Sequence, residues 1–344
     1  MTISHYDTQT LLGVIDALDR PSKALASVYL RSEFGDTSES IAFDKINSSR
    51  KIAPYVSPLV AGRVIKSKSE KVTSFKPAYV KPKHVLDPTR TIKRRPGERL
   101  AGGLTHAERF GLNVADILRE QDEMIARREE VMAIEVLRTG KVVVASDDFP
   151  AMEVDFERNA AHTVALTGGA RWGEPGVKIL DNLKTWAETV QKNSGAHPYH
   201  VTLDPKAASL LTADPDIKAI LDIQRQVSGI LELAGVAVGG MGKEFRRVGA
   251  IGDFEFYVYQ QYYHDASGTL QQMMPDNTVI MGNPELSEGW QAYGAIMDHG
   301  SLQAEARFPK MWDDDDPSVT YIMTQSAPLP VVGRVDATLC ATVR

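Results

Sequence analysis

The strongest constraint on how this chain folds is the separation of charge between one stretch and the rest. Residues 63–99 hold twelve Lys and Arg side chains against three acids, Glu70, Asp87 and Glu98, for a net charge of +9. The whole chain carries a formal net charge of −6, so the remaining residues sum to −15. Charges segregated this sharply indicate that each part meets a surface of the opposite sign.

The residue pattern within this basic stretch is typical of an exposed β-hairpin. Apolar and polar residues alternate, as at Tyr79 and Lys81, and four prolines interrupt residues 63–99. Period-two alternation with prolines favours edge strands over a core sheet. A long hairpin with little apolar content has no core of its own. It therefore needs another surface, and the acidic remainder of a second copy is the nearest candidate. The predicted intersubunit contacts are Arg63, Lys66, Lys68, Lys71, Lys76, Lys81, Lys83, Arg90, Lys93, Arg94, Arg95 and Arg99.

Composition sets broad limits on the class of protein. With 344 residues, 43% of them hydrophobic, the chain can form two or three compact units. No apolar run reaches the roughly 18 residues that cross a bilayer, and the N-terminal residues lack the pattern of a signal peptide. We therefore expect no membrane partner. The single cysteine, Cys340, excludes an internal disulfide and suits a reducing cytoplasm. A sequence pI near 5.8 argues against a dedicated nucleic-acid binder, although the basic stretch leaves that possibility open locally.

The clearest helical pattern follows the basic stretch. Thr105 and Glu108 fit a capping box, and apolar residues recur with helical spacing from Phe110 to Met132. Gly140 is a natural end for this helix. A helix of about 30 residues would be roughly 45–50 Å long at 1.5 Å per residue. This length predicts a spine that supports several other elements.

Shorter elements are predicted on both sides of the spine. Residues 1–50 are expected to form an extended arm with one short helix near 10–18. The other predicted elements are strands at 141–146, 152–156, 199–203, 254–259 and 279–281, and helices at 172–193, after Asp204 and at 217–227. Residues 304–344 alternate between short strands and proline breaks. This order predicts an α+β fold whose last strands can rejoin an earlier sheet.

A possible phosphate loop at Gly239–Lys243 does not meet the Walker pattern. Ala237 occupies the position of the first glycine, and Glu244 replaces the Ser or Thr that would hold magnesium. A flexible loop is the better interpretation. A nucleotide-dependent enzyme that uses these residues remains an alternative, although no group of residues in the chain predicts catalysis or a bound cofactor.

Other metal-ligating or reactive residues also have simpler interpretations. His197 and His200 flank a proline and have no obvious third ligand, which favours a structural or surface role over metal binding. The run Asp313–Asp316 lacks the alternation and glycine of an EF-hand loop, so we expect a solvated turn or a docking surface. Cys340 is expected to be a small buried hydrophobe. We therefore predict no metal site.

Four segments in collinear order resemble the lambda-type phage major capsid family E, and the similarity covers most of the chain from about Tyr55. The segments are YVSPLVAGRVIKSKSEKVTSFKPAYVKPKH from Tyr55, PDNTVIMGN (Pro275–Asn283), ARFPKMW (Ala306–Trp312) and MTQSAPL (Met323–Leu329). Four spaced motifs are far more specific than any single one.

This resemblance implies the Hong Kong 97-type tailed-phage capsid fold. By this comparison the chain divides into an N-terminal arm (1–50), an extended loop over a neighbour (51–100), a peripheral domain with the spine helix (101–194), an axial domain (195–303) and strands that return to the peripheral domain (304–344). The implied function is structural: a major capsid protein that self-assembles into hexamers and pentamers of an icosahedral shell enclosing double-stranded DNA. Its place would be the virion, after assembly in the host cytoplasm.

The resemblance also implies interaction partners, and two alternative functions remain open. Besides copies of itself, the chain is expected to meet a portal and a separate scaffolding protein, because an arm of about 50 residues is short for a built-in scaffold. A decoration protein is left open. One rival is a nucleic-acid-binding module that uses residues 63–99, where Phe75 and Tyr79 could stack on bases. Another is a cellular nanocompartment shell of the same fold.

Overall fold

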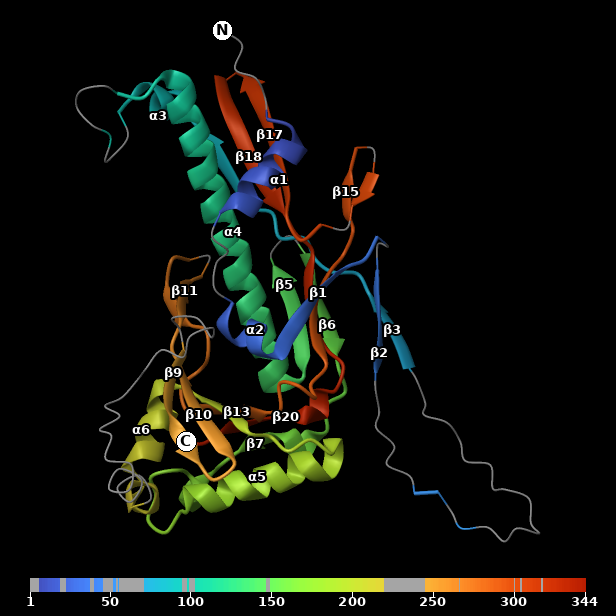
Figure 1. Cartoon of the computed structure of the whole chain (residues 1–344), viewed down its shortest axis with the longest axis vertical. Coiled ribbons are helices and arrows are strands. Elements are labelled where there is room, and N and C mark those ends of the chain that lie inside the picture. Colours follow the sequence, from blue (N-terminus) through green and yellow to red (C-terminus); the bar gives the residue numbers. More distant parts are fainter. Residues whose placement is uncertain are drawn as a thin grey trace.

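The computed structural model describes residues 6–18, 23–37, 40–45, 52–53, 55, 71–94, 98, 103–146, 149–219, 245–265, 267–299, 301–303, 305–316 and 318–344 (Figure 1). The α-helices are α1 (Thr8–Ala17), α2 (Ala24–Tyr29), α3 (Pro88–Ile92), α4 (His106–Thr139), α5 (Ile179–Ser194) and α6 (Pro205–Ala213). The strands are β1 (Leu30–Gly35), β2 (Ile41–Lys45), β3 (Lys71–Phe75), β4 (Lys83–Leu86), β5 (Lys141–Ser146), β6 (Phe149–Asp155), β7 (Thr163–Ala165), β8 (His200–Leu203), β9 (Phe245–Ile251), β10 (Phe254–Tyr259), β11 (Tyr262–His264), β12 (Leu270–Gln272), β13 (Thr278–Gly282), β14 (Gly289–Tyr293), β15 (Ile296–Asp298), β16 (Ser301–Gln303), β17 (Phe308–Asp315), β18 (Ser318–Gln325), β19 (Pro328–Val332) and β20 (Thr338–Thr342). Within these residues no helix has both the length and the apolar character needed to cross a membrane.

Helix α4 is the predicted spine, and both of its ends are fixed by local hydrogen bonds. The Thr105 hydroxyl accepts from the Glu108 amide at 3.3 Å, and the Glu108 carboxylate accepts from the Thr105 amide at 2.7 Å. Gly140 ends the helix with φ of 71°, a left-handed conformation that glycine adopts without strain. The helix has 34 residues and is therefore about 51 Å long. The predicted capping box, length and stop are confirmed.

Elements from both ends of the chain cover the spine helix (Figure 1). Near its start, buried residues of α1, β4 and β18 pack on Phe110, Val114 and Leu118. Near its end, β1, β14 and β19 form a sheet with the order β1-β14-β19, whose apolar residues pack on Met132 and Val136. The spine therefore joins one end of the molecule to the other, because its first and last turns bury side chains against different elements.

The N-terminal segment is more folded than the sequence predicts. Instead of an extended arm with one helix, residues 24–29 form a second helix, α2, whose Leu25 and Tyr29 are fully buried. The Glu130 carboxylate of α4 accepts from the Leu25 amide at 2.7 Å and from the Ala26 amide at 3.0 Å. This distant carboxylate takes the place of a local N-cap, which is why no capping signal is visible in the sequence.

A six-stranded sheet forms the other end of the molecule, with the order β7-β20-β13-β8-β10-β9. Helices α5 and α6 pack on it through Trp186 and Leu211, and Trp172 is fully buried among them. The strand β20, near the end of the chain, pairs with β13 along its whole length, from Thr338 to Thr342. The prediction that the last strands rejoin an earlier sheet is confirmed.

The sheets group the chain differently from the predicted segments. Residues 163–194 pack with the six-stranded sheet and not with the spine, whereas β14, inside the predicted segment 195–303, pairs with β1 and β19. Within 304–344, β17 to β19 stay with the spine but β20 does not. The chain thus passes several times between the spine end of the molecule and the end with the six-stranded sheet. The predicted consecutive ranges therefore do not coincide with these two ends.

The predicted hairpin is also placed differently. The strand β3 pairs with β2, from Ile41–Phe75 to Lys45–Lys71, so the first strand lies before residue 51. Residues 76–94 return to the body, where β4 is the edge strand of a sheet with the order β17-β18-β4. The Asp87 carboxylate then caps α3, accepting from the Thr89 amide at 2.8 Å. This Asp-Pro helix start is a signal that the hairpin interpretation overlooked.

Candidate subunit-contact surfaces

The ribbon formed by β2 and β3 stands apart from the main body and is anchored at one end only (Figure 1). Ile41 and Phe75, the first pair of the ribbon, are buried in the cluster that includes Met132 of the spine. Among the described residues neither strand has a third partner. A two-stranded ribbon is at best marginally stable by itself, so this geometry favours a second surface along it.

The twelve predicted contact residues do not form one continuous hairpin surface. Five lie outside the described residues: Arg63, Lys66, Lys68, Arg95 and Arg99. Lys71 is in β3, where only its backbone is described. The other six lie on the segment that returns along the body: Lys76, Lys81, Lys83, Arg90, Lys93 and Arg94. The structure therefore distributes the charge over a ribbon and one face of the body.

On the body, the exposed face of the β17-β18-β4 sheet combines a cation with aromatic rings. The Lys83 ammonium lies 3.7 Å from the Tyr321 ring centroid and 4.9 Å from that of Trp312. The two rings stack with centroids 5.4 Å apart, and Val85, which pairs with Tyr321, is 46% exposed. Cations favour the negative faces of such rings. This face holds Lys83 in place and leaves apolar surface open.

Further along, the short helix α3 lies beside the start of the spine. The Arg90 carbonyl accepts from the Asn113 side chain at 3.3 Å, and the Arg94 guanidinium donates to the Glu98 carbonyl at 2.8 Å. The Glu98 carboxylate pairs with Arg109 of α4 at 2.8 Å. Lys93 is exposed. The cations of this segment are therefore presented on the surface by contacts with the protein's own spine.

A buried charged cluster, not predicted from the sequence, ties residues 305–307 to the spine. The Arg307 guanidinium binds the Glu129 carboxylate through two nitrogens, at 2.7 and 3.3 Å, and the Asp122 carboxylate at 2.6 Å. The Lys23 ammonium lies 2.8 Å from the second Glu129 oxygen and 3.3 Å from both Glu33 and the Tyr293 hydroxyl. Arg307, Glu129 and Asp122 are all buried.

The pKa shifts of this cluster show how strongly its charges are coupled. Burial alone would raise the pKa of Glu129, but the adjacent Arg307 and Lys23 outweigh it and hold the pKa below its ordinary value. Burial would likewise lower the pKa of Lys23, but Glu129 raises it above its ordinary value. Tyr293 has its pKa raised to about 12 by burial and by Glu129. All these groups keep their ordinary charge at neutral pH.

The one sequence signal for this cluster is the motif ARFPKMW, which contains Arg307. An arginine between Ala306 and the buried Phe308 is an unusual position for a solvated charge. Its partners, however, lie 178 and 185 residues away. Only the fold brings them together.

The remaining candidates have structural roles. His200 is buried and stacked on Tyr257 with centroids 4.6 Å apart, and burial lowers its pKa to about 4. Cys340 is buried in β20, where burial raises its pKa to about 11. The predicted burial of Cys340 is confirmed, and the structural or surface role of the histidines stays a prediction. Asp313–Asp316 are exposed at the β17–β18 turn, and residues 239–243 lie outside the described part of the chain. Within the described residues no group of three or more His, Cys, Asp or Glu is placed to hold a metal ion.

Comparisons with known proteins agree with this architecture. Residues 7–343 match the family described as Phage major capsid protein E. The major capsid protein of Escherichia phage lambda is 30% identical over 339 residues, which cover 97% of this chain and 98% of that protein. The major capsid protein of Escherichia phage N15 is 28% identical over 342 residues, with coverage of 97% and 98%.

Solved structures show the same fold. A crystal structure of a prophage capsid protein from E. coli CFT073 has a TM-score of 0.76 at 22% identity, covering 99% of this chain and 100% of that one. The capsid of a native GTA particle has a TM-score of 0.51 at 11% identity, with coverage of 94% and 91%. The expected capsid fold is confirmed. The matched family consists of structural proteins of the phage head and not of enzymes. The chain belongs to the phage major capsid protein E family.

Proposed function

We propose that copies of this chain assemble into the hexamers and pentamers of a closed icosahedral shell that encloses double-stranded DNA. The observation that carries the arrangement is the β2–β3 ribbon, which has two strands, one buried anchor pair and no third strand among the described residues. Such a ribbon is stabilised when it lies on a neighbour. In a shell every subunit has neighbours, so each copy can supply that surface to the next.

The two ends of the molecule correspond in this proposal to the two domains of the capsid fold. The spine helix with β1, β14, β17, β18 and β19 is the peripheral domain. The six-stranded sheet with α5 and α6 is the axial domain, near the centre of each capsomer. The β2–β3 ribbon and the residues between its strands are the extended loop, so this loop occupies about residues 41–75.

The twelve basic residues are proposed to contact neighbouring subunits. Each exposed ion pair stabilises a contact by only about 0.2–1 kcal/mol. A shell repeats every contact in every subunit, and a basic surface on an acidic neighbour also fixes their relative orientation. A wall that is acidic overall would bind packaged DNA weakly, because like charges repel.

A charge reversal of three consecutive basic residues, of which Lys93 and Arg94 are described, tests this proposal. The variant Lys93→Glu/Arg94→Glu/Arg95→Glu should stay folded by circular dichroism but fail to sediment as closed shells. The matched control is Arg171→Glu/Lys178→Glu/Lys184→Glu beside α5, which makes the same charge change on the axial domain. Electron microscopy of the unaltered chain should show icosahedral particles, and a monomer under all assembly conditions would refute the proposal.

The same experiment addresses the nucleic-acid alternative. If the reversed variant forms normal shells that fail to retain DNA, the basic residues contact DNA and not neighbours. We further propose that assembly takes place in the host cytoplasm and uses a separate scaffolding protein and a portal. A decoration protein would add to the shell from outside. Co-purification of particles at successive stages of assembly tests these partners.

A further inference from the structure

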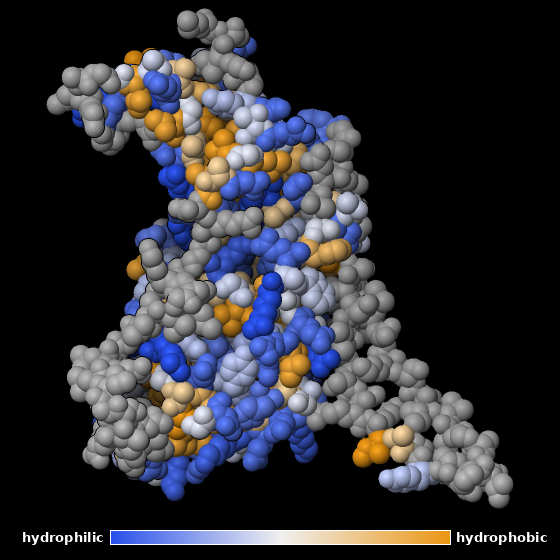
Figure 2. All heavy atoms as spheres, in the orientation of Figure 1, coloured by the Kyte–Doolittle hydropathy of each residue, from blue (hydrophilic) through white to orange (hydrophobic). Residues whose placement is uncertain are grey.

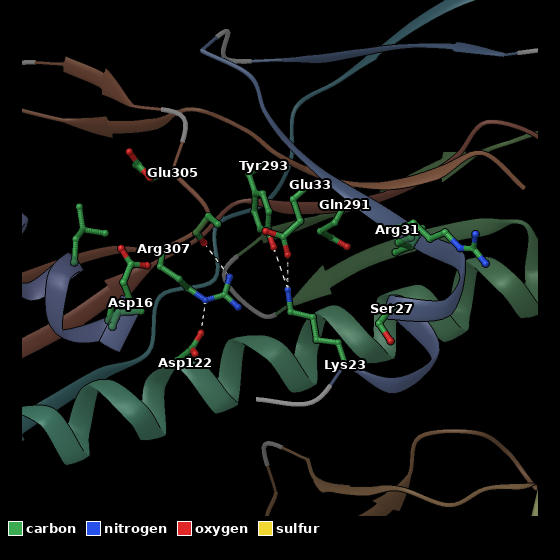
Figure 3. A pocket seen from close by; sticks show the side chains of 15 residues that line it. Asp16, Lys23, Ser27, Arg31, Glu33, Asp122, Gln291, Tyr293, Glu305 and Arg307 are labelled. Carbon is green, nitrogen blue, oxygen red and sulfur yellow. Dashed lines mark hydrogen bonds and ion pairs between the residues drawn. The ribbon is translucent and has the colours of Figure 1, made fainter. Parts of the chain in front are cut away.

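A pocket of about 650 Å³ lies between the N-terminal helices, the spine and the β1-β14 strands. Figure 3 shows Lys23, Arg307 and Asp122 between the spine and the strands, with Asp16 and Glu305 both on the Arg307 side of the view. On the face drawn in Figure 2, hydrophilic side chains prevail over the middle of the molecule, where α2 and β1 lie. The pocket is lined by charged side chains as well as apolar ones.

The charges that line the pocket leave an acidic excess at its rim. The lining includes four acids and three bases: Asp16, Glu33, Asp122, Glu305, Lys23, Arg31 and Arg307. Both inner bases already bind carboxylates, including the buried Glu129 behind them. Asp16 and Glu305 are exposed, and among the described residues neither makes a hydrogen bond or an ion pair. This rim can accept a cation.

A buried side chain in the same pocket also lacks a partner. Gln291 of β14 lines the pocket and is 4% exposed, yet neither its carboxamide oxygen nor its nitrogen has a hydrogen-bond partner within the described residues. Buried amides are rarely left without partners. Gln291 lies opposite Glu33 in the β1–β14 register, on the strand that forms one wall. Its carboxamide nitrogen and oxygen can hydrogen-bond with the backbone of an incoming peptide segment that also carries a cation.

The chain itself contains a segment with the required charge. Residues 46–70 carry five Lys or Arg side chains against one acid, Glu70, for a net charge of +4. This segment begins and ends at the Lys45–Lys71 pair, the end of the ribbon opposite its buried anchor. Both ends of the segment are therefore attached to the end of the ribbon that lies opposite the anchor at Ile41 and Phe75.

We propose that this pocket receives a Lys or Arg side chain from residues 46–70 of a second copy of the chain. The incoming ammonium or guanidinium group donates hydrogen bonds to the Asp16 and Glu305 carboxylates, and the backbone beside it satisfies Gln291. This inference rests on the proposed function, because it names the surface on which the extended loop of a neighbouring subunit lies.

Carbodiimide crosslinking of mixed isotopic copies tests the inference. Shells are assembled from equal amounts of ¹⁴N- and ¹⁵N-labelled chain, and the reagent joins lysines to carboxylates that they touch. We expect Asp16 or Glu305 linked to Lys51, Lys66 or Lys68, with about half of the linked peptides joining a light to a heavy chain. Links only between like labels, or no links to these carboxylates, would overturn the inference.

Variants separate the pocket from the general charge of the subunit. Asp16→Asn/Glu305→Gln should reduce shell yield at limiting protein concentration about tenfold, whereas the control Glu174→Gln/Glu188→Gln, with the same charge change near α5, should not. Gln291→Leu should raise the Tm of the unassembled subunit while it lowers shell yield. Normal shell yield for both pocket variants, Asp16→Asn/Glu305→Gln and Gln291→Leu, would overturn the inference and leave the proposed function standing. Failure of the unaltered chain to form any oligomer would overturn both.

Discussion

Replacing Arg307 with methionine should destabilise the unassembled subunit by about 3–5 kcal/mol at pH 7. Arg307 is 9% exposed and binds both Glu129 and Asp122, which are themselves buried. Methionine has a similar volume, so the main effect is on charge. Glu129 then keeps Lys23 as its one cationic partner among the described residues, and Asp122 loses the Arg307 guanidinium. This uncompensated charge, and not the loss of the contact energy, sets the expected magnitude.

The effect should depend on pH with a definite sign. In the native protein the pKa of Glu129 lies below its unfolded value, so its contribution to stability is complete above about pH 4.3 and is lost as the pH falls through the folded pKa. In the variant, the burial of Glu129 is opposed by Lys23 alone, so the pKa of this carboxylate should rise. The variant then takes up a proton on folding. The difference in unfolding free energy should therefore shrink as the pH falls from 7 towards 5.

Urea denaturation of both proteins at several pH values measures this difference. The control is Arg127→Met on the same helix, where Arg127 is 48% exposed and pairs with Glu123 at 2.7 Å. Exposed pairs at this spacing contribute about 0.3–0.5 kcal/mol. A loss for Arg307→Met no larger than that of the control, or one that does not change with pH, would refute the reasoning.

Three further predictions concern other buried positions. Burial lowers the pKa of His200 to about 4, below its unfolded value near 6.5. The free energy of unfolding should therefore decrease by up to about 3 kcal/mol as the pH falls from 6.5 to 4, and His200→Phe should remove that loss in urea titrations. The Cys340 thiol, with its pKa raised to about 11, should react with a thiol reagent only after unfolding, whereas fast labelling of the native subunit would contradict its burial. Gly289→Ala places a methyl group against the Tyr29 carbonyl at the end of α2 and should cost about 1–3 kcal/mol, seen as a lower Tm; an unchanged Tm would contradict this close approach.

Much of the local structure could be predicted from the sequence because its causes are local. The ends of the spine helix follow from the Thr105–Glu108 capping box and Gly140, which act within one turn, and its length follows from the spacing of apolar residues along it. The helix after Asp204 is similar, because that carboxylate accepts from the Lys206 and Ala207 amides next to it. Each of these end signals concerns hydrogen bonds that close over two to four residues.

The charge segregation and the collinear motifs were also enough to predict the family and a surface between subunits. They did not locate the hairpin, because the partner of β3 is chosen by the burial of Ile41 and Phe75 against the spine and not by residues 51–70. They also missed α2, whose N-terminal amides bind Glu130, more than 100 residues away. In both cases the deciding contact is long-range.

The candidate site shows the same difference between local and long-range causes most clearly. By itself the sequence determined that the chain has a basic stretch, an acidic remainder and the elements of a capsid fold. Only the tertiary structure brought Arg307 to Glu129 across 178 residues, and placed Asp16, Glu305 and Gln291, which has no side-chain partner among the described residues, around one pocket. Hydrogen bonds within a turn are set by neighbouring residues, whereas burial and charge pairing depend on which distant surfaces the whole chain packs together.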